Sequence, residues 1–364
     1  MQIIYQGIQN IVEALKGATK VLIVCDSSYP YLSIRGNIED IGIPYVFFSD
    51  FTPNPLYEDV CKGVKSFQDA QCDTLLAVGG GSSLDVAKCI KLYCKMPKDT
   101  FFLEQEYKDT GVKLVAVPTT AGTGSESTRY AVIYYGGKKQ SVTHDSIVPD
   151  VAILEPKVLK TLPLYQKKCT MMDALCQGIE SWWSVNSTDK SRNLSRLAVE
   201  EIMAWWREYI FDNTANAAEH IMRAANIAGQ AICITQTTAP HAFSYKITSI
   251  YNLPHGHAVS VCLPVIWKFM LDNMDKCTDS RGSAYLEGIF EDISVAMGCT
   301  SPIDSIICFS SMLDEMDMAN PKGGLVEEEI NILSSSVNPT RLKNNPVSLS
   351  DISIKRLYEQ IVSK

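Results

Sequence analysis

The chain has 364 residues, a net charge of −8 at pH 7 and an isoelectric point near 5.3. Hydrophobic residues make up 46% of it and charged residues 20%, as in an ordinary globular protein, and the length allows two domains. The acidic balance and the absence of a lysine or arginine cluster argue against nucleic acid and anionic membranes as partners.

The cysteines are the second compositional signal. All 12 are spread singly along the chain with no C-x-x-C pair, which is typical of reduced core thiols rather than of a disulfide framework. The first residues lack the basic-then-apolar pattern of a signal peptide, and no apolar run reaches the roughly 18 residues that a membrane span needs. We therefore expect a cytoplasmic protein.

Short apolar runs alternate with helical patterns over residues 1–162. The runs predicted as buried strands are 20–26 (KVLIVCD), 45–50 (YVFFSD), 74–81 (TLLAVGGG), 113–120 (KLVAVPTT) and 150–156 (DVAILEP). Helical patterns lie between several of them, for example over 58–70. Continuous apolar strands separated by helices predict an α/β domain whose parallel sheet is covered on both faces.

From residue 163 onward the strand patterns stop. Long helical patterns take their place, among them 167–185, 195–210 and 351–364. The sequence therefore predicts an all-helical domain over residues 163–364. A cleft between two such domains is a common place for a ligand.

A glycine-rich turn joins a predicted strand to a predicted helix. It consists of Gly79, Gly80, Gly81 and Ser82. Glycines let the backbone approach a ligand closely, and the free N–H groups of a helix start attract anions, so the turn has the form of a phosphate cradle. Neither G-x-G-x-x-G nor G-K-[ST] is present, and a purely structural turn is the alternative.

A second polar turn, within residues 116–130 (AVPTTAGTGSESTRY), also follows a strand. It contains two glycines and the hydroxyl side chains Thr119, Thr120, Thr123, Ser125 and Ser127. Alone it would read as a solvated loop. Two such turns at the carboxyl ends of strands in one parallel sheet favour a dinucleotide site, because ligands of these sheets gather at that edge.

The stretch 171–183 (MMDALCQGIESWW) has the pattern of a buried helix. Asp173 and Gln177 stand four residues apart on one face of it, and burying either without a partner costs about 2 kcal/mol. His241 and His255 each follow a proline in apolar surroundings. Asp173 with these two histidines would form a 2-His-1-carboxylate set for a divalent metal, with Gln177 as a weaker oxygen ligand. The alternative is a pair of core histidines satisfied by hydrogen bonds.

Taken together, these segments resemble the iron-containing (group III) alcohol dehydrogenase family over nearly the whole chain. The matching motifs are PNP (53–55), GGGSSLDVAK (79–88), VPTTAGTGSE (117–126), MDAL (172–175) and PHGHA (254–258). The resemblance implies a Rossmann-like N-terminal domain and a helical C-terminal domain, the architecture shared with dehydroquinate synthase. It also implies NAD(P) and a divalent metal, Fe(II) or Zn(II).

The resemblance also implies roles for individual residues. The cofactor-binding set is Gly79, Gly80, Gly81, Ser82, Asp85, Thr119, Thr120, Ser125 and Lys139, with Asp85 on the nicotinamide side and Lys139 at a ribose. The metal ligands are Asp173, Gln177, His241 and His255. Two positions depart from the family pattern: relatives usually have histidine in place of Gln177, and many have histidine in place of Tyr245. An amide oxygen is a harder, poorer donor than imidazole, which leaves the identity of the metal open.

The implied reaction is reversible hydride transfer between a nicotinamide and a small aldehyde or primary alcohol. Asp85 and His257 are the catalytic candidates, with His257 or the ribose hydroxyls relaying the proton. Residues 138–150 and 172–188 look most like the branch that reduces phosphonoacetaldehyde to 2-hydroxyethylphosphonate. The alternatives are a general short-chain, butanol dehydrogenase-like aldehyde reductase, a cyclase or lyase of the dehydroquinate synthase type, and a metal-free NAD-binding relative.

Two further residues bear on specificity. Asp26 ends a predicted strand, where its carboxylate can bind the adenosine ribose and repel a 2′-phosphate, so we expect NAD(H) to be preferred over NADP(H). The alternative is an Asp that only caps the next turn. Arg129 has the planar fork that suits a phosphonate, and an ion pair with a carboxylate such as Glu126 is its alternative. A homodimer is the expected assembly.

Overall fold

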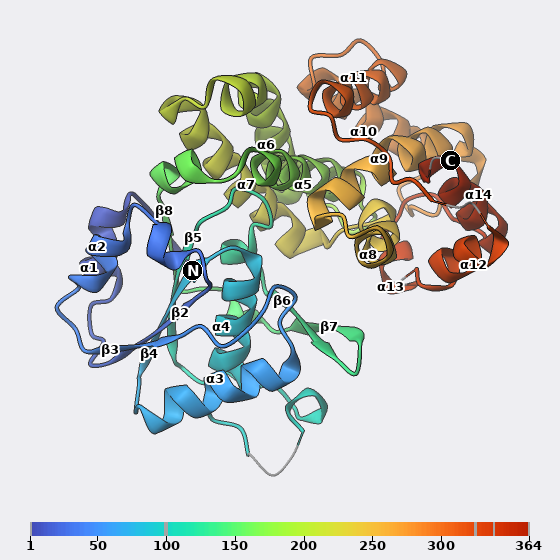
Figure 1. The fold of residues 1–364 in the computed structure, drawn as a ribbon. Helices are drawn as coiled ribbons and strands as arrows, with labels where there is room; N and C mark the ends of the chain where they lie inside the picture. Colours follow the sequence, from blue (N-terminus) through green and yellow to red (C-terminus); the bar gives the residue numbers. More distant parts are fainter. Residues whose placement is uncertain (1, 98–100, 324–325, 338, 363–364) are drawn as a thin grey trace. The chain divides into compact units, whose positions relative to one another are not determined.

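The computed structural model describes residues 2–97, 101–323, 326–337 and 339–362. It divides into two compact units (Figure 1). The first consists of Met1–Leu162 and Asn213–Gly229, and the second of Pro163–Asp212 and Gln230–Lys364. The chain passes from one unit to the other after residue 162, where the sequence pattern changes. Residues 213–229, which follow that change, cluster with the first unit.

The first unit is built on a six-stranded parallel sheet in the order β1-β8-β5-β4-β2-β3. The strands are β1 (Ile3–Gln6), β2 (Val21–Cys25), β3 (Tyr45–Phe48), β4 (Thr74–Gly79), β5 (Lys113–Pro118) and β8 (Val151–Leu154). β2, β4 and β8 are buried at every residue. The α/β fold class is thereby confirmed. β1 was not predicted, because this edge strand is short and mostly exposed and lacks a long apolar run.

The helices that lie wholly in the first unit are α1 (Ile11–Ala14), α2 (Arg35–Glu39), α3 (Tyr57–Asp69) and α4 (Gly81–Tyr93); α7 (Ala215–Thr235) begins in it. α3 and α4 pack on one face of the sheet, which presents alternate residues such as Leu75 and Ala77 to them. The core of the first unit is therefore a sheet–helix interface.

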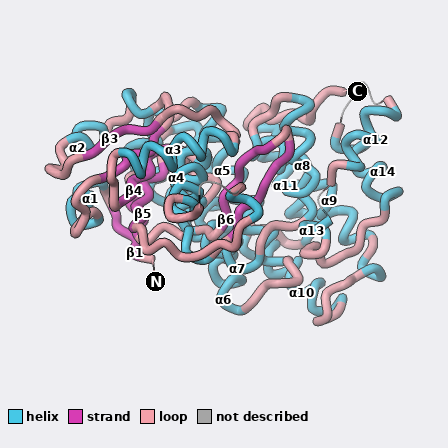
Figure 2. The backbone as a smooth tube through the Cα atoms, turned by 90° about the horizontal axis from the view of Figure 1, so that it is seen from below, coloured by secondary structure: helices cyan, strands magenta, loops and turns pink. Residues whose placement is uncertain are grey.

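A separate antiparallel hairpin, β6 (Tyr130–Tyr135) and β7 (Lys138–Thr143), stands apart from the main sheet in Figure 2. Gly136 and Gly137 join its strands with φ of 55° and 72°, the positive values that a two-residue type I′ turn requires. The sequence pattern does not predict this hairpin, because β7 is largely polar and only one of its residues is buried.

The second unit is helical, as predicted. Besides the end of α7, it contains α5 (Leu164–Trp183), α6 (Asp189–Arg207), α8 (Ala239–Tyr251), α9 (His255–Asp272), α10 (Ser283–Ala296), α11 (Pro302–Glu315), α12 (Glu327–Ser335), α13 (Pro339–Leu342) and α14 (Asp351–Ile361). α5 packs against α6 and α9, and α9 packs against α8. Trp183 and Trp267 meet edge to face, 5.5 Å between ring centroids, in the core. In the described part of the chain, every helix is too short or too polar to cross a membrane.

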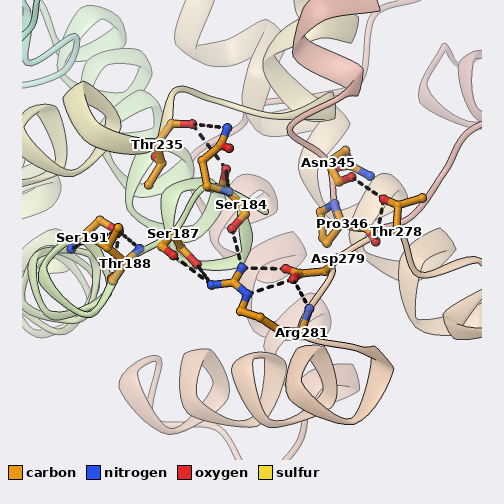
Figure 3. A network of polar contacts seen from close by, with 11 residues as sticks. Ser184, Ser187, Thr188, Ser191, Thr235, Thr278, Asp279, Arg281, Asn345 and Pro346 are labelled. Carbon is orange, nitrogen blue, oxygen red and sulfur yellow. Dashed lines mark hydrogen bonds and ion pairs between the residues drawn. The ribbon is translucent and has the colours of Figure 1, made fainter.

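An arginine holds the turn between α5 and α6 (Figure 3). Arg281 donates from Nη2 to the carbonyl of Ser184, at the end of α5, and from Nη1 to the carbonyl of Ser187, at 3.0 and 2.8 Å. Its guanidinium also binds Asp279, 2.6 Å from Nη2 to Oδ2. The carboxylate orients the guanidinium, and the guanidinium satisfies carbonyl groups that the end of α5 leaves open.

Candidate active site

The glycine turn lies between β4 and α4, as predicted. Gly79 has φ +155°, and a Cβ atom there would lie 2.2 Å from Ser83 Oγ, so the position requires glycine. Gly80 precedes the first turn of α4, and no side chain caps that turn. The N–H groups at the start of α4 are thus available to an anion.

The hydroxyl-rich turn after β5 lies beside the glycine turn. β4 and β5 are neighbouring parallel strands, and Gly79 is paired with Pro118. A Cβ atom on Gly80 would lie 3.6 Å from Thr120 Cγ2, and one on Gly81 3.0 Å from Thr123 Cγ2. The two turns that the sequence analysis singled out therefore face each other at the carboxyl edge of the sheet.

Asp26 follows β2, at the same edge. Its Oδ2 accepts a hydrogen bond from Ser83 Oγ at 3.0 Å, and its Oδ1 accepts one from the backbone N–H of Ser28 at 2.8 Å. A Cβ atom on Gly79 would lie 2.9 Å from Asp26 Oδ2. The carboxylate is thus held next to the glycine turn.

Asp85 connects α4 to the second turn and to the hairpin. It accepts hydrogen bonds from Ser125 Oγ at 2.9 Å and from the backbone N–H of Val132 at 3.0 Å. Burial raises the pKa of Asp85 above its ordinary value, against the opposing charges of Lys88 and, more weakly, Lys139. Lys139, on β7, thus acts on this carboxylate electrostatically.

Lys88, one turn after Asp85 on α4, was given no role in the sequence analysis. Its fully buried ammonium group donates to Ser125 Oγ at 2.9 Å, Thr128 Oγ1 at 3.0 Å and the carbonyl of Tyr130 at 2.8 Å. These three hydrogen bonds from Lys88 hold the end of the hydroxyl-rich turn in place. The sequence feature that could have identified Lys88 is its position as a charged residue on the buried face of an apolar helix.

The second unit contains a cluster of possible metal ligands. Asp173 lies in α5, His241 in the first turn of α8, and His255 is the first residue of α9; one ligand atom from each lies within 4.8 Å of the others. Asp173 Oδ1 is 3.4 Å from His241 Nε2 and 3.9 Å from His255 Nε2. No described residue gives Asp173 Oδ1 a hydrogen bond of normal geometry.

Gly256 explains how His255 reaches this cluster. A Cβ atom at Gly256 would lie 1.9 Å from the carbonyl oxygen of Cys169 and 3.0 Å from Asp173 Cβ. The start of α9 can therefore contact α5 only because this residue has no side chain. The close approach places His255 opposite Asp173.

Gln177 is buried one turn after Asp173. Burial raises the pKa of Asp173, but the close contact and charge of His241, the charge of His255 and the amide of Gln177 outweigh it and leave the pKa below its ordinary value. Tyr245 stacks on the ring of His255, with centroids 6.0 Å apart and planes 17° apart. The two positions that depart from the family pattern thus lie within the cluster.

Glu180, like Lys88, has no role in the sequence-based predictions. It is fully buried, and its Oε1 accepts a hydrogen bond from His241 Nδ1. Burial lowers the pKa of His241, but the carboxylates of Glu180 and Asp173 outweigh it and raise that pKa to about 10. Its spacing could have identified Glu180 from the sequence, because residues 173, 177 and 180 share one face of a helix.

These residues fit a divalent metal ion. Two buried carboxylates surround His241, so the site favours a cation. The Nδ1 atom of His241 is used by Glu180, which leaves Nε2 on the side of Asp173 and His255. A buried carboxylate oxygen without a hydrogen bond of normal geometry from the described part of the chain is a donor that a cation would satisfy.

His257 lies outside this cluster. It is buried, with Nε2 2.9 Å from the carbonyl of Ala319 and Nδ1 2.8 Å from the hydroxyl of Tyr165. Nε2–H therefore donates to Ala319, and Nδ1 accepts from Tyr165. Burial lowers the pKa of His257, in keeping with a neutral ring.

Arg129 forms an ion pair, but not with Glu126. Its Nη1 lies 3.0 Å from Asp145 Oδ1, and its Nε is 3.3 Å from the hydroxyl of Tyr130. Glu126 instead accepts a hydrogen bond from Asn226 at 3.0 Å. The side chain of Asp145 is 85% exposed, so this ion pair is screened by solvent.

The chain is similar to known proteins in sequence and in fold. The family model "iron-containing alcohol dehydrogenase" matches residues 4–156, and "Fe-containing alcohol dehydrogenase family, C-terminal" matches residues 168–362. Phosphonoacetaldehyde reductase of Streptomyces viridochromogenes is 29% identical over 328 residues, which cover 86% of this chain and 82% of the relative. The probable alcohol dehydrogenase EutG of Salmonella typhimurium is 34% identical over 220 residues, 59% of this chain and only 56% of the relative.

The fold of the chain is similar to that of a solved structure. The crystal structure of sulfoacetaldehyde reductase from Bifidobacterium kashiwanohense, in complex with NAD+, matches with a TM-score of 0.89 and 25% identity, covering 100% of this chain and 97% of that one. The family models together span both units of the chain, including the glycine turn and the Asp173 cluster. The chain therefore belongs to the iron-containing alcohol dehydrogenase family of oxidoreductases.

Proposed function

We propose that this protein transfers hydride between NAD(H) and a small aldehyde or primary alcohol, with a divalent metal, Fe(II) or Zn(II), held in the second unit. The observation that supports this most directly is the convergence of Asp173, His241 and His255 from three helices. Asp173 Oδ1, beside the two imidazoles, has no hydrogen bond of normal geometry from any described residue, which favours a metal site over a purely structural role.

The cofactor site of the proposal is the carboxyl edge of the sheet. The N–H groups at the start of α4 and the facing hydroxyl-rich turn would bind the diphosphate, with Thr119, Thr120 and Ser125 along the nucleotide. Asp26 would accept hydrogen bonds from the adenosine ribose and disfavour a 2′-phosphate. Lys139 would contact the other ribose. The hydride chemistry itself belongs to the nicotinamide.

The metal would be held by Asp173, His241 and His255, with the amide oxygen of Gln177 as a fourth donor. When bound, the ion supplies Lewis-acid polarisation of the substrate oxygen. The close packing at Gly256 would hold His255 opposite Asp173 before the ion binds. His257 is the proposed proton relay, and its exchange with solvent would run through the hydroxyl of the exposed residue Tyr165.

The substrate we propose is a two-carbon aldehyde that bears an anionic group, phosphonoacetaldehyde first. Two relatives named above are reductases of phosphonoacetaldehyde and of sulfoacetaldehyde, which share this chemistry. Arg129 is the proposed anion-binding residue. A second candidate is a general short-chain aldehyde reductase, favoured by the observation that Arg129 already binds Asp145.

One experiment tests the proposal. The purified protein is analysed for bound metals, and NADH oxidation is followed with phosphonoacetaldehyde, sulfoacetaldehyde and butyraldehyde. We expect iron or zinc near one ion per chain and the highest kcat/KM with an anionic aldehyde. Equal kcat/KM for butyraldehyde would leave the general reductase. A protein without metal and without NADH oxidation on any aldehyde would overturn the function.

We further propose that the enzyme is cytoplasmic and forms a homodimer. All cysteines are free thiols in the structure, in keeping with a reducing compartment. Light scattering of the purified protein would measure its mass, and fractionation of its host cells would locate it.

A further inference from the structure

We propose that Glu180 is the positioning residue of the metal site, because it determines which nitrogen of His241 carries the proton and thereby the affinity for the metal. The inference rests on the metal site in the proposed function. It concerns a residue that does not itself coordinate the ion.

The hydrogen bonds around Glu180 allow its carboxylate only one orientation. Oε2 accepts from the backbone N–H of Thr238 at 2.7 Å and from Thr238 Oγ1 at 2.9 Å. The Thr238 hydroxyl also accepts from Trp183 Nε1, at 2.8 Å, so its own proton is directed to Glu180. Oε2 therefore serves two donors, and Oε1 faces His241 Nδ1.

This arrangement fixes the imidazole. An ionised carboxylate has no proton to donate, so the hydrogen bond requires that Nδ1 of His241 carry the proton. Nε2, 3.4 Å from Asp173 Oδ1, is then the nitrogen that can present a lone pair to a metal. A carboxylate behind a ligating histidine also makes the imidazole a stronger donor, and losing such a partner typically lowers metal affinity by about 10–100-fold.

Glutamine at position 180 keeps the shape of the side chain but replaces one acceptor oxygen of the carboxylate with an NH2 donor. The backbone N–H of Thr238 can only donate, so the oxygen of the new amide must occupy the Oε2 position. Its NH2 group then faces His241 Nδ1, which must accept. The ring proton moves to Nε2, where it blocks coordination and points to Asp173 instead.

A matched control is available in the first unit. Glu155 is also buried, and its two oxygens accept backbone N–H groups of Ile8, at 2.9 Å, and Lys157, at 3.1 Å. Glu155→Gln therefore places an amide NH2 against a backbone N–H that cannot accept it, a penalty at least as large as that of Glu180→Gln, at a residue outside the proposed metal site. It reports the general cost of such a substitution.

The experiment measures Zn(II) affinity by competition with a chromophoric chelator, in the full chain, for wild type, Glu180→Gln and Glu155→Gln. We expect Glu180→Gln to bind Zn(II) about 100-fold more weakly, and Glu155→Gln to bind it as wild type does. Histidine 15N–1H NMR of the metal-free proteins, with only five histidines to assign, is recorded as pH is raised until the His241 ring has lost one proton. The remaining proton should lie on Nδ1 in wild type and on Nε2 in Glu180→Gln.

The outcomes separate this inference from the function on which it rests. If wild type binds no metal, the proposed function fails, while the NMR spectra still test the role of Glu180. If Glu180→Gln keeps the Nδ1 proton and binds Zn(II) within about threefold of wild type, the inference is wrong. Should Glu180→Gln fail to fold, Glu180→Asp keeps the carboxylate, and we expect it to retain the Nδ1 proton with intermediate affinity; loss of that proton would overturn the role.

Discussion

Asp173 Oδ1 lies 3.4 Å from His241 Nε2, and this contact joins the middle of α5 to the first turn of α8. Both side chains are buried, so the charge of each strongly affects the electrostatic environment of the other. The Asp173 carboxylate and His241 Nε2 would both help to hold the proposed metal ion. The first predictions concern this pair and its neighbours.

Removing a proposed ligand should remove the metal. Asp173→Ala and His255→Ala delete an anionic or imidazole donor, so we expect at least about 100-fold weaker metal binding and loss of turnover in a folded protein. Elemental analysis, circular dichroism and NADH oxidation measure the three properties. His220→Ala, outside the cluster, is the control. Wild-type metal content in either ligand variant would refute the assignment.

Gln177 should limit the affinity of the site. In Gln177→His an imidazole replaces the amide oxygen beside Asp173, and we expect Zn(II) to bind roughly tenfold more tightly, about 1.4 kcal/mol. Chelator competition gives the dissociation constants, and Gln177→Ala shows what the amide itself contributes. An affinity unchanged in both variants would mean that residue 177 does not contact the metal.

Asp26 should determine the choice of cofactor. In Asp26→Gly the carboxylate that would meet the 2′-phosphate is gone, and we expect the ratio of kcat/KM for NADPH to that for NADH to rise at least about tenfold. Ser83→Ala removes only a hydroxyl that donates to Asp26 and should keep the preference for NADH. Equal efficiency with both cofactors in wild type would disprove the role of Asp26.

Arg129 should distinguish anionic from neutral aldehydes. Arg129→Ala is expected to lower kcat/KM for phosphonoacetaldehyde by roughly ten- to a hundredfold, as the loss of a charge-assisted pair costs about 1.5–3 kcal/mol. Butyraldehyde should be unaffected. Asp145→Asn removes the competing carboxylate and should lower KM for the anionic aldehyde. If Arg129→Ala changes neither substrate, Arg129 serves only its pair with Asp145.

The Asp279–Arg281 pair should make stability depend on pH in acid. Burial raises the pKa of Asp279, but its hydrogen bonds with Arg281 outweigh this and leave the pKa below the ordinary value. The folded-state pKa is depressed, so the pair's contribution is present above the unfolded pKa, about 3.9, and is lost as pH falls through the folded value.

Arg281→Met leaves the Asp279 side chain, which is 1% exposed, without its cation. We expect a loss of about 3 kcal/mol in the free energy of unfolding at pH 7, measured with urea, and a smaller difference from wild type below about pH 4. Arg196→Met, which breaks an exposed pair with Glu200, should cost less than about 0.5 kcal/mol. A difference that is the same at both pH values would contradict the pH argument.

Much of the fold follows from patterns between near neighbours in the chain. The buried strands β2, β4, β5 and β8 are continuous apolar runs, and the glycine turn at Gly79 interrupts one of them at the start of a helix. Helical periodicity alone places Asp173 and Gln177 on one face. These features depend on local backbone geometry, so their residue types and spacing suffice to predict them.

The residues that meet across the fold depend on tertiary packing. His241 and His255 reach Asp173 because α8 and α9 pack as they do and because Gly256 lets α9 touch α5. From the sequence we inferred that Asp173 and Gln177 need a polar partner and that the histidines supply it. The orientation of Glu180, in contrast, depends on its hydrogen bonds with Thr238, which lies at the start of another helix. The partner of a side chain depends on distances in space, and spacing along one helix does not specify these distances. They are set by the packing of the whole chain.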